Sequence, residues 1–363
     1  MNPTIQLTAL NRIQIPTWRW LAMNETTVDI DADLTLPYRG GVLTGAEEVE
    51  ISRFFTPVAI PHLPADLERL RTFVAAHHNY TLRLTIAQGV QVAEPIVLDF
   101  LLDAASPVLV DELEIHAEAG SRATVVVRYR SDGAAKGFHA GFAAVWAEAG
   151  SDVRLITIQH LGDQDTHLSG SAVTVGEGGD GSILSCDTGG GQVISGSNIS
   201  LAGSKSRGGL EAMYLGREGS TQDFNYRLEA RAPESEGHIV CRGALAGNAK
   251  KTMKSTLDFI RGAVGAKGRE EETVLSLSDR AIHRSIPLLL CGEDNVEGSH
   301  ATSSGRVDPL KLTYLMSRGL SRPEAVRLMV EASLTPLVNR LPTARLRDEV
   351  VQQIREVIDD GQR

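Results

Sequence analysis

The middle of the chain, residues 80–277, is a long series of short strand-like segments with no helix-like segment between them. In the first segment Leu82, Leu84 and Ile86 alternate with polar residues, which is the period-two pattern of a β-strand. Further segments follow, separated by Gly, Asn, Asp or Pro, at residues 96–102, 108–115, 124–129, 153–158, 183–186, 199–201, 256–260 and 274–277. Strands without intervening helices argue against a doubly wound sheet, so the pattern predicts a mainly β fold.

A short internal repeat narrows this β fold further. The sequence AEAGS occurs at residues 117–121 and again at 147–151, and each copy precedes a β-branched run. A repeat at a few tens of residues is typical of solenoids and propellers, and the chain has no Gly-His or Trp-Asp blade signature. Its 35 glycines and 5% aromatic residues suit many tight turns. The pattern favours a β-helix with coils of roughly 20–30 residues, and a β-sandwich is the alternative.

The two ends of the chain differ from this central region. In residues 1–79, apolar residues at helical spacing between positions 63 and 76 predict one helix. Trp18 and Trp20 form an aromatic pair that either faces a partner or packs on the main domain. After Ala301 we expect helices. We therefore divide the chain into a partly helical N-terminal segment (1–79), a β-helix core (80–300) and a C-terminal helical domain (301–363).

Capping signals define two consecutive helices in the C-terminal part. Asp308 and Pro309 are suited to begin the first helix and Gly319 to end it. Ser321 and Glu324 have the spacing of a capping box at the start of the second. Two apolar stripes at helical spacing follow, one with Ala325, Leu328, Met329 and Ala332, the other with Leu346, Val350, Ile354, Val357 and Ile358. These stripes either cap the end of the solenoid or receive a partner.

Charge and composition exclude several classes of function. The net charge of −10 argues against a general nucleic-acid or anionic-membrane surface, and no apolar run is long enough to span a bilayer. The first residues lack the basic start and apolar core of a signal peptide, so we expect a cytoplasmic protein. The three cysteines, Cys186, Cys241 and Cys291, are widely spaced, which predicts free thiols and no disulfide framework.

His300 is the strongest single candidate for a functional residue. We expect it in a loop of small residues after a buried terminal strand at 287–290. A neutral imidazole can ligate iron or zinc, or act as a base near neutral pH; the alternative is a surface or packing histidine. Cys291 and Glu297 are nearby in sequence and are the other two candidates for a metal site at an interface. Cys186 and Cys241 are interpreted as small buried hydrophobic residues in strands.

Three other polar stretches are interpreted structurally. The glycine-rich residues 187–191 are expected to form a corner of the solenoid, although a backbone nest for an anion is the alternative. Asp163, Asp165 and His167 are expected to form a polar turn and not a metal loop. The lysines within residues 250–254 are expected on a solvated strand edge.

Motifs in the second half of the chain carry a resemblance to a known family. The string SHAT at residues 299–302, followed by YLMSRGLSRPEA at 314–325, resembles the C-terminal signature of the SufB/SufD family of iron–sulfur cluster assembly proteins. Residues 212–226 and the glycines near Gly243 and Gly247 are also similar to that family. The resemblance covers roughly residues 151–332. It implies a right-handed parallel β-helix with a small C-terminal helical domain.

The resemblance also implies a function and a set of partners. The chain is then expected to be a non-catalytic scaffold subunit that holds a transient iron–sulfur cluster near His300. Its expected partners are a SufC-type ABC ATPase and either a SufB-type chain or a second copy of itself. The residues expected to dock the ATPase are Tyr314, Arg318, Leu328 and Met329, since interface hot spots favour Tyr and Arg, and apolar anchors at helical spacing suit a groove.

Two departures from the family pattern qualify this expectation. SufD-type chains often carry a cysteine two residues before the histidine, where this chain has Gly298. SufB-type chains carry a functional cysteine in the strand that here reads NISL, at residues 198–201. The chain therefore resembles SufD or an undifferentiated family member. A β-helix carbohydrate-active enzyme, which needs paired carboxylates, and a purely structural assembly subunit without a metal role are the alternatives.

Overall fold

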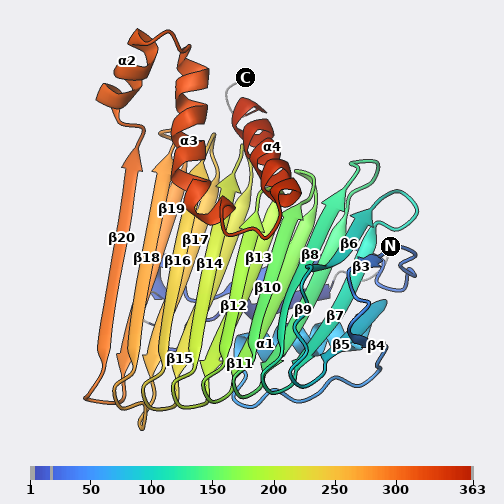
Figure 1. The fold of residues 1–363 in the computed structure, drawn as a ribbon. Helices are drawn as coiled ribbons and strands as arrows, with labels where there is room; N and C mark the ends of the chain where they lie inside the picture. Colours follow the sequence, from blue (N-terminus) through green and yellow to red (C-terminus); the bar gives the residue numbers. More distant parts are fainter. Residues whose placement is uncertain (1–4, 17–18, 361–363) are drawn as a thin grey trace.

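A parallel β-solenoid forms the body of the molecule (Figure 1). The computed structural model describes residues 5–16 and 19–360. The chain passes alternately through two nine-stranded sheets, which we call the front sheet and the back sheet.

In spatial order the front sheet contains β20 (Glu297–Arg306), β18 (Lys267–Ser276), β16 (Glu236–Leu245), β14 (Arg207–Gly216), β12 (Asp180–Asp187), β10 (Asp152–His160), β8 (Arg122–Ser131), β6 (Ile96–Leu102) and β3 (Val42–Thr44). The back sheet contains β19 (Ile282–Cys291), β17 (Lys250–Phe259), β15 (Thr221–Ala230), β13 (Gln192–Leu201), β11 (Thr166–Val175), β9 (Phe138–Ala147), β7 (Val108–Ala117), β5 (Tyr80–Ile86) and β4 (Glu50–Ser52).

Consecutive coils stack as parallel strands in register, which confirms the predicted mainly β solenoid. In the back sheet Thr166 pairs with Gln192, and Lys250 pairs with Ile282, so the coils repeat after 26 to 32 residues. The two AEAGS copies fall at the corners after β7 and β9, where Gly120 and Gly150 have φ values of +68° and +67°. Glycine adopts this left-handed conformation without a steric penalty. The sequence repeat therefore marks a corner of the coil.

A ladder of glycines lets the two sheets approach each other. The glycines share one register position in five neighbouring strands and are Gly181, Gly208, Gly237, Gly268 and Gly298. A Cβ atom at Gly237 would lie 2.3 Å from Leu228 of the back sheet, and one at Gly268 would lie 2.8 Å from Phe259. Large apolar side chains of the back sheet fill the space in front of these glycines, within the main buried core between the sheets.

The N-terminal segment covers the outer face of the back sheet. The antiparallel strands β1 (Ile5–Leu10) and β2 (Thr26–Ile30) form a ribbon, with the short 3₁₀ helix η1 (Arg19–Leu21) between them. The predicted helix is present as α1 (Ala65–His77). It packs beside this ribbon on the sheet. Trp20 is 79% exposed, and Trp18 lies outside the described residues.

Two lysines that the sequence analysis placed on a solvated edge are buried. Their strand β17 lies between β15 and β19, so it is not an edge. Lys254 faces the N-terminal ribbon, and its Nζ lies 2.8 and 2.9 Å from the two carboxylate oxygens of Asp223, which also accepts a hydrogen bond from Asn11. Lys251 faces the interior and pairs with Glu272. The prediction was wrong because both lysines have carboxylate partners from distant coils, which the local sequence does not show.

The chain stays extended beyond Ala301, contrary to expectation, because β20 continues to Arg306. Three helices follow: α2 (Pro309–Ser317), α3 (Arg322–Val338) and α4 (Ala344–Asp360). Asp308 caps α2, and Ser321 with Glu324 forms the predicted capping box of α3. The helices α3 and α4 lie on the outer face of the front sheet (Figure 1), and α2 packs on α3.

The buried face of α3 differs from the predicted stripe. Ala325 is buried, but Leu328 is 46% exposed and Met329 is half-buried. The side chains that α3 buries against α2 and the front sheet include Val326, Val330 and Leu334. On α4 the predicted stripe is correct, since all five of its residues are buried: Leu346, Val350, Ile354, Val357 and Ile358.

The glycine corner after β12 and the two buried cysteines confirm further interpretations of the sequence. Gly189–Gly191 lie at the corner after β12, as expected, with Gly190 at φ +86°. Cys186 and Cys241 are buried. Asp165 supports a turn by accepting a hydrogen bond from Gly137 N at 2.6 Å, whereas His167 belongs to β11. Among residues 5–16 and 19–360, no helix combines the length and apolar character needed to cross a membrane.

Candidate functional site at the open end of the solenoid

The two ends of the solenoid are built differently. At the N-terminal end, the three-residue strands β3 and β4 pair antiparallel with β6 and β5 and complete the sheets. At the other end, β19 and β20 are each ten residues long and are the last strands of their sheets. Within the described residues, no strand pairs with their outer edges. Unpaired backbone groups along such edges are a template for another chain.

His300 lies at this open end, on the inward-facing side of β20. Its register partner in β18 is Glu270, and the side chains of β18 alternate between the interior and the outer face. Glu272, two residues on, reaches the interior lysine Lys251, so Glu270 and His300 also face inward. His300 is exposed because no further coil covers it. The expected loop around His300 was wrong: the small residues there form an edge strand.

The other two predicted ligands do not converge on His300. Glu297 is three positions earlier on β20, so it faces the opposite side, and its carboxylate lies 3.0 Å from Lys267 Nζ. Cys291 is exposed and ends β19, beside the corner that leads into β20. In the described part of the chain, no three His, Cys, Asp or Glu side chains form a group that can hold a metal ion. The three candidates are therefore not brought together within the described residues.

The glycine that replaces the expected cysteine has a packing role. Gly298 is the last glycine of the ladder, and a Cβ atom there would lie 2.9 Å from Leu289 and 3.0 Å from Phe259. A real Cβ almost never sits as close as the first of these contacts, so a cysteine would require Leu289 to shift. The contacting atom is the end of the Leu289 side chain, which is 36% exposed, so this shift is a small one.

A buried polar network lies directly behind His300. Ser255 Oγ donates a hydrogen bond to Glu270 Oε1 at 3.0 Å. The neighbouring carboxylate of Glu272 accepts hydrogen bonds from Lys251 and Ser285, and from Tyr214 as described below. Burial raises the pKa of Glu270, and the nearby charge of His300 partly opposes this shift. Burial also lowers the pKa of Lys251, against the effect of Glu272. Both pKa shifts therefore follow mainly from the burial of these charged groups.

This network extends into the solenoid and was missed from sequence. Tyr214 OH donates to Glu272 Oε1 at 2.8 Å, and Tyr214 and Glu272 are almost completely buried. One signal was available: Glu270 follows Gly268 by two residues, as His300 follows Gly298. Recognition of the glycine ladder in the sequence would have paired the two residues.

A groove of about 1060 Å³ crosses the outer face of the front sheet and ends at β20. Glu211 lies in it, with carboxylate oxygens 3.4 Å from Arg154, 3.5 Å from His238 and 3.5 Å from Arg340. Burial raises the pKa of Glu211, but the hydrogen bond with His238 and the two arginine charges outweigh burial and lower it. Since Arg340 belongs to the connection between α3 and α4, this cluster ties the helices to the sheet.

The helix α2 presents an apolar surface to solvent. Leu310 is 81% exposed and Tyr314 is 57% exposed, although Leu312 on the same helix is buried against α3. The guanidinium of Arg318 lies over the ring of Tyr314, 5.3 Å from its centroid. The exposed Leu328 on α3 adds to the apolar surface of the helical region. Of the four predicted docking residues, Tyr314, Arg318 and Leu328 are therefore exposed and Met329 is half-buried.

These features define a β-solenoid protein with one closed end and one end open to strand pairing. The chain belongs to the SufB/SufD family, because the family model described as "SUF system FeS cluster assembly, SufBD core domain" matches residues 100–333.

Individual relatives agree with this assignment. The chain is 35% identical over 164 residues to the iron–sulfur cluster assembly protein SufD of Bacillus subtilis, which covers 45% of this chain and 38% of that protein. It is 23% identical over 279 residues to a SufBD family protein of Mycobacterium leprae, with 75% and 70% covered. A SufBD family protein of Staphylococcus epidermidis is 25% identical over 204 residues, 56% of this chain and 44% of that protein. The chain thus matches less than half the length of two of these relatives.

Proposed function

We propose that the chain is a non-catalytic scaffold subunit of iron–sulfur cluster assembly in the cytoplasm, and that the cluster is built as cargo at the open mouth of the solenoid. A SufB-type chain, or a second copy of this chain, pairs with the edges of β19 and β20. A SufC-type ABC ATPase binds the exposed surface of α2 and α3. This proposal favours the assembly role over the carbohydrate-active alternative, since the chain is a family member.

The observation that carries the proposal is the position of His300 on an unpaired edge strand. An imidazole can ligate iron, but iron–sulfur clusters need several ligands, mostly thiolates. Because the described residues supply no group of three, the partner chain must complete the set. Cys291, at the adjacent corner, is the thiol of this chain that is available for transient binding.

The position of α2 suggests how an ATPase could act on this mouth. Only Val307 and Asp308 separate the end of β20 from the start of α2. A displacement of α2 by a bound ATPase is therefore transmitted directly to the edge strand that carries His300. In this role the ATPase drives the movement, and the interface at the edge of β20 rearranges in response.

The experiment is to purify the chain with its bound partners from the native host, identify these partners, and measure iron and acid-labile sulfide. The His300→Ala variant should keep the partners but lose iron and sulfide. Thr302→Ala is the matched control, because Thr302 lies two residues further along the same face of β20. Equal iron and sulfide in the wild type and in His300→Ala would reject the ligand role.

A purely structural assembly subunit is the second candidate function. Gly298, at the position where SufD-type chains often carry a cysteine, favours it. For this function His300→Ala leaves iron and sulfide unchanged, while disruption of the β19 and β20 edges still prevents assembly.

A further inference from the structure

We propose that Pro287 interrupts the edge of β19, so that β20 is the edge along which the SufB-type partner continues the solenoid by an unbroken hydrogen-bond ladder. Pro287 thereby also keeps the isolated chain from pairing with other copies of itself through β19. This inference rests on the proposed function for the identity of the partner, but the effect on self-association is a property of the chain alone.

The backbone nitrogen of Pro287 points away from the solenoid. In a β-strand the N–H and C=O groups of successive residues point to opposite sides. Ile282 N donates to Ala249 O at 2.9 Å, on the side of β17. Gly292 N donates to Phe259 O at 2.8 Å, on the same side. The even-numbered residues of β19 therefore bond to β17, and Pro287 faces the open edge, where it removes an outward donor but no hydrogen bond of the solenoid.

The edge of β20 presents a complete set of backbone groups. Glu297 N donates to Ala266 O at 2.9 Å, so the odd-numbered residues of β20 bond to β18. The even-numbered residues, which face the open edge, are Gly298, His300, Thr302, Ser304 and Arg306. None of them is a proline, so each offers both an N–H and a C=O group to a further strand.

The other two outer edges of the sheets are short. At the closed end, β3 and β4 are three residues long each. Among the strands that the structure describes, only β19 contains a proline. Very short edge strands and edge prolines both protect proteins from unwanted strand pairing. Of the four outer edges in the described sheets, β20 is therefore the one that is both long and uninterrupted.

The interrupted edge is also the apolar one. Residues 286–291 of β19 read IPLLLC and carry no charge, whereas β20 reads EGSHATSSGR and has no large apolar side chain. An uncharged apolar strand without proline is prone to aggregate, and a proline at a position that makes no hydrogen bond prevents this. Pro287 thus lies on the edge where indiscriminate pairing would be easiest, while the polar edge stays open to a specific partner.

The interruption favours a different chain as the partner. Two copies joined at their open ends would bring two β19 edges together, each without a donor at Pro287. Each missing donor leaves a carbonyl group of the opposite strand unpaired, which is costly where water is excluded. A different chain brings no second copy of this interruption. We therefore assign the edge of β20 to the SufB-type chain and not to a second copy.

The first test is the self-association of the isolated full-length chain, measured by sedimentation equilibrium over a range of concentrations. Pro287→Val restores the outward N–H and keeps the hydrogen bonds between β19 and β17. This variant should associate at concentrations about 10-fold lower than the wild type, because each copy gains a donor. Leu289→Val is the control: the backbone of Leu289 also faces the open edge, and its replacement changes the side chain without changing the donors.

The second test is the affinity for the purified SufB-type chain of the same host. Thr302→Pro removes an outward donor from β20 and should bind this chain about 10-fold more weakly than Thr302→Ala. Ser304→Pro, at the next outward position, should behave in the same way. Leu289→Pro removes a donor from the edge that is already interrupted, so it should bind as Leu289→Ala does. Thermal unfolding shows which variants retain the fold.

A folded Pro287→Val variant that associates no more than the wild type overturns the role of Pro287. Failure of both Pro287→Val and Pro287→Ala to fold overturns it as well, because Pro287 would then serve the fold itself. Full affinity of a folded Thr302→Pro or Ser304→Pro variant, or a second copy bound at β20 in place of the SufB-type chain, overturns the assignment of that edge. Self-association is measured on the isolated chain, so a complex without iron or sulfide would reject the proposed function and leave the role of Pro287 standing.

Discussion

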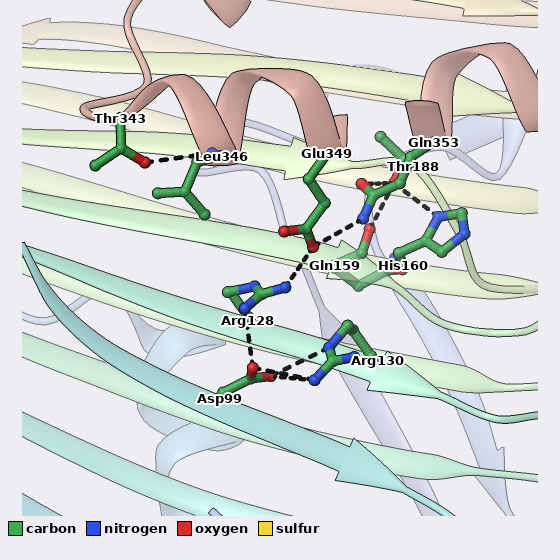
Figure 2. Close-up of polar contacts among 10 residues, drawn as sticks. All are labelled: Asp99, Arg128, Arg130, Gln159, His160, Thr188, Thr343, Leu346, Glu349 and Gln353. Atoms are coloured by element: carbon green, nitrogen blue, oxygen red, sulfur yellow. Dashed lines mark hydrogen bonds and ion pairs between the residues drawn. The ribbon is translucent and has the colours of Figure 1, made fainter. Parts of the chain in front are cut away.

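Arg128 on β8 and Glu349 on α4 form an ion pair that fixes the C-terminal helix to the front sheet, with Arg128 Nη2 2.5 Å from Glu349 Oε1 (Figure 2). The same guanidinium lies 2.9 Å from Asp99 on β6. Further along α4, Thr188 Oγ1 donates to Gln353 at 3.0 Å. The arginine side chain is 11% exposed, so this pairing is shielded from water and helps hold α4 over the buried apolar face.

Arg128→Ala should destabilise the protein by about 2 kcal/mol, between the values for surface and buried ion pairs, because it leaves Asp99 and Glu349 partly buried without their cation. Urea unfolding measures the loss, and hydrogen exchange should show faster opening of α4. The control is Arg345→Ala, at the exposed start of α4, which should remain within about 0.5 kcal/mol of the wild type. An unchanged hydrogen-exchange rate in α4 would show that the ion pair between Arg128 and Glu349 does not hold this helix on the sheet.

Lys254→Met should destabilise the protein by about 3 kcal/mol, because it leaves Asp223 buried without its cation. The loss should also loosen the N-terminal ribbon, since Asp223 accepts the hydrogen bond from Asn11 at 2.9 Å. Denaturant unfolding and limited proteolysis of the ribbon measure these effects. Lys250→Met is the matched control on the same strand: Lys250 is exposed, and its replacement should have little effect. Equal stability of the two variants would show that the buried pair of Lys254 and Asp223 contributes nothing to the free energy of unfolding.

The solenoid could be predicted from sequence because its signals are local. Alternating apolar residues mark the strands, and glycines such as Gly120 and Gly150 mark the corners. The capping box of Ser321 and Glu324 was equally local and was correct. Each of these signals depends on backbone geometry within a few residues.

The candidate site could be predicted only in part, because it depends on contacts between coils. His300 could be selected from its motif, but its place in an edge strand depends on the register with Glu270, thirty residues earlier. Lys251 and Lys254 were placed at the surface because their partners, Glu272 and Asp223, come from other coils. Polar residues inside a solenoid pair with residues of neighbouring coils. A single sequence shows which residues of two coils are neighbours only through a repeated feature such as the glycine ladder.

Asp187→Asn should change the pH dependence of stability. Burial raises the pKa of Asp187 to about 6, although a hydrogen bond from Ser185 lowers it. Since the folded state binds this proton more tightly than the unfolded state, the associated stability is present below the unfolded pKa and is lost as pH rises through about 6. Relative to Asp187→Asn, the wild type should therefore lose about 2 kcal/mol between about pH 4 and pH 7.

Unfolding free energies of both proteins across this range measure the difference, and titration of other groups cancels in the comparison. Parallel curves for the wild type and Asp187→Asn would show that Asp187 keeps an ordinary pKa in the folded protein.

Leu288→Glu and Leu290→Glu should weaken pairing at the open end, because they place charge on the terminal strand of the back sheet. Light scattering of the complex should show a lower mass, while thermal unfolding of the isolated chain shows whether the fold is retained. Leu101→Glu is the control: Leu101 is 39% exposed on β6, near the closed end. An unchanged mass in both folded variants would place the contact elsewhere.

Arg318→Ala tests whether α2 and α3 dock the ATPase. The guanidinium contact that the structure gives Arg318 is the ring of Tyr314 on its own helix, and an exposed pair of this kind contributes less than about 1 kcal/mol to folding. The variant should therefore keep its unfolding free energy within about 0.5 kcal/mol of the wild type. Its affinity for the ATPase should fall about 30-fold, which corresponds to a hot spot of about 2 kcal/mol.

Tyr314→Ala should give the same result, because its ring forms the exposed surface beside Arg318, and Arg345→Ala on α4 should bind the ATPase normally. Pull-down and titration with the purified ATPase measure binding, and calorimetry measures stability. A drop in melting temperature with a proportional loss of binding would instead identify Arg318 as an intramolecular clamp. If the Arg318→Ala variant keeps both its stability and its affinity for the ATPase, the ATPase does not dock through Arg318. The reason is that truncation of a hot-spot residue lowers affinity.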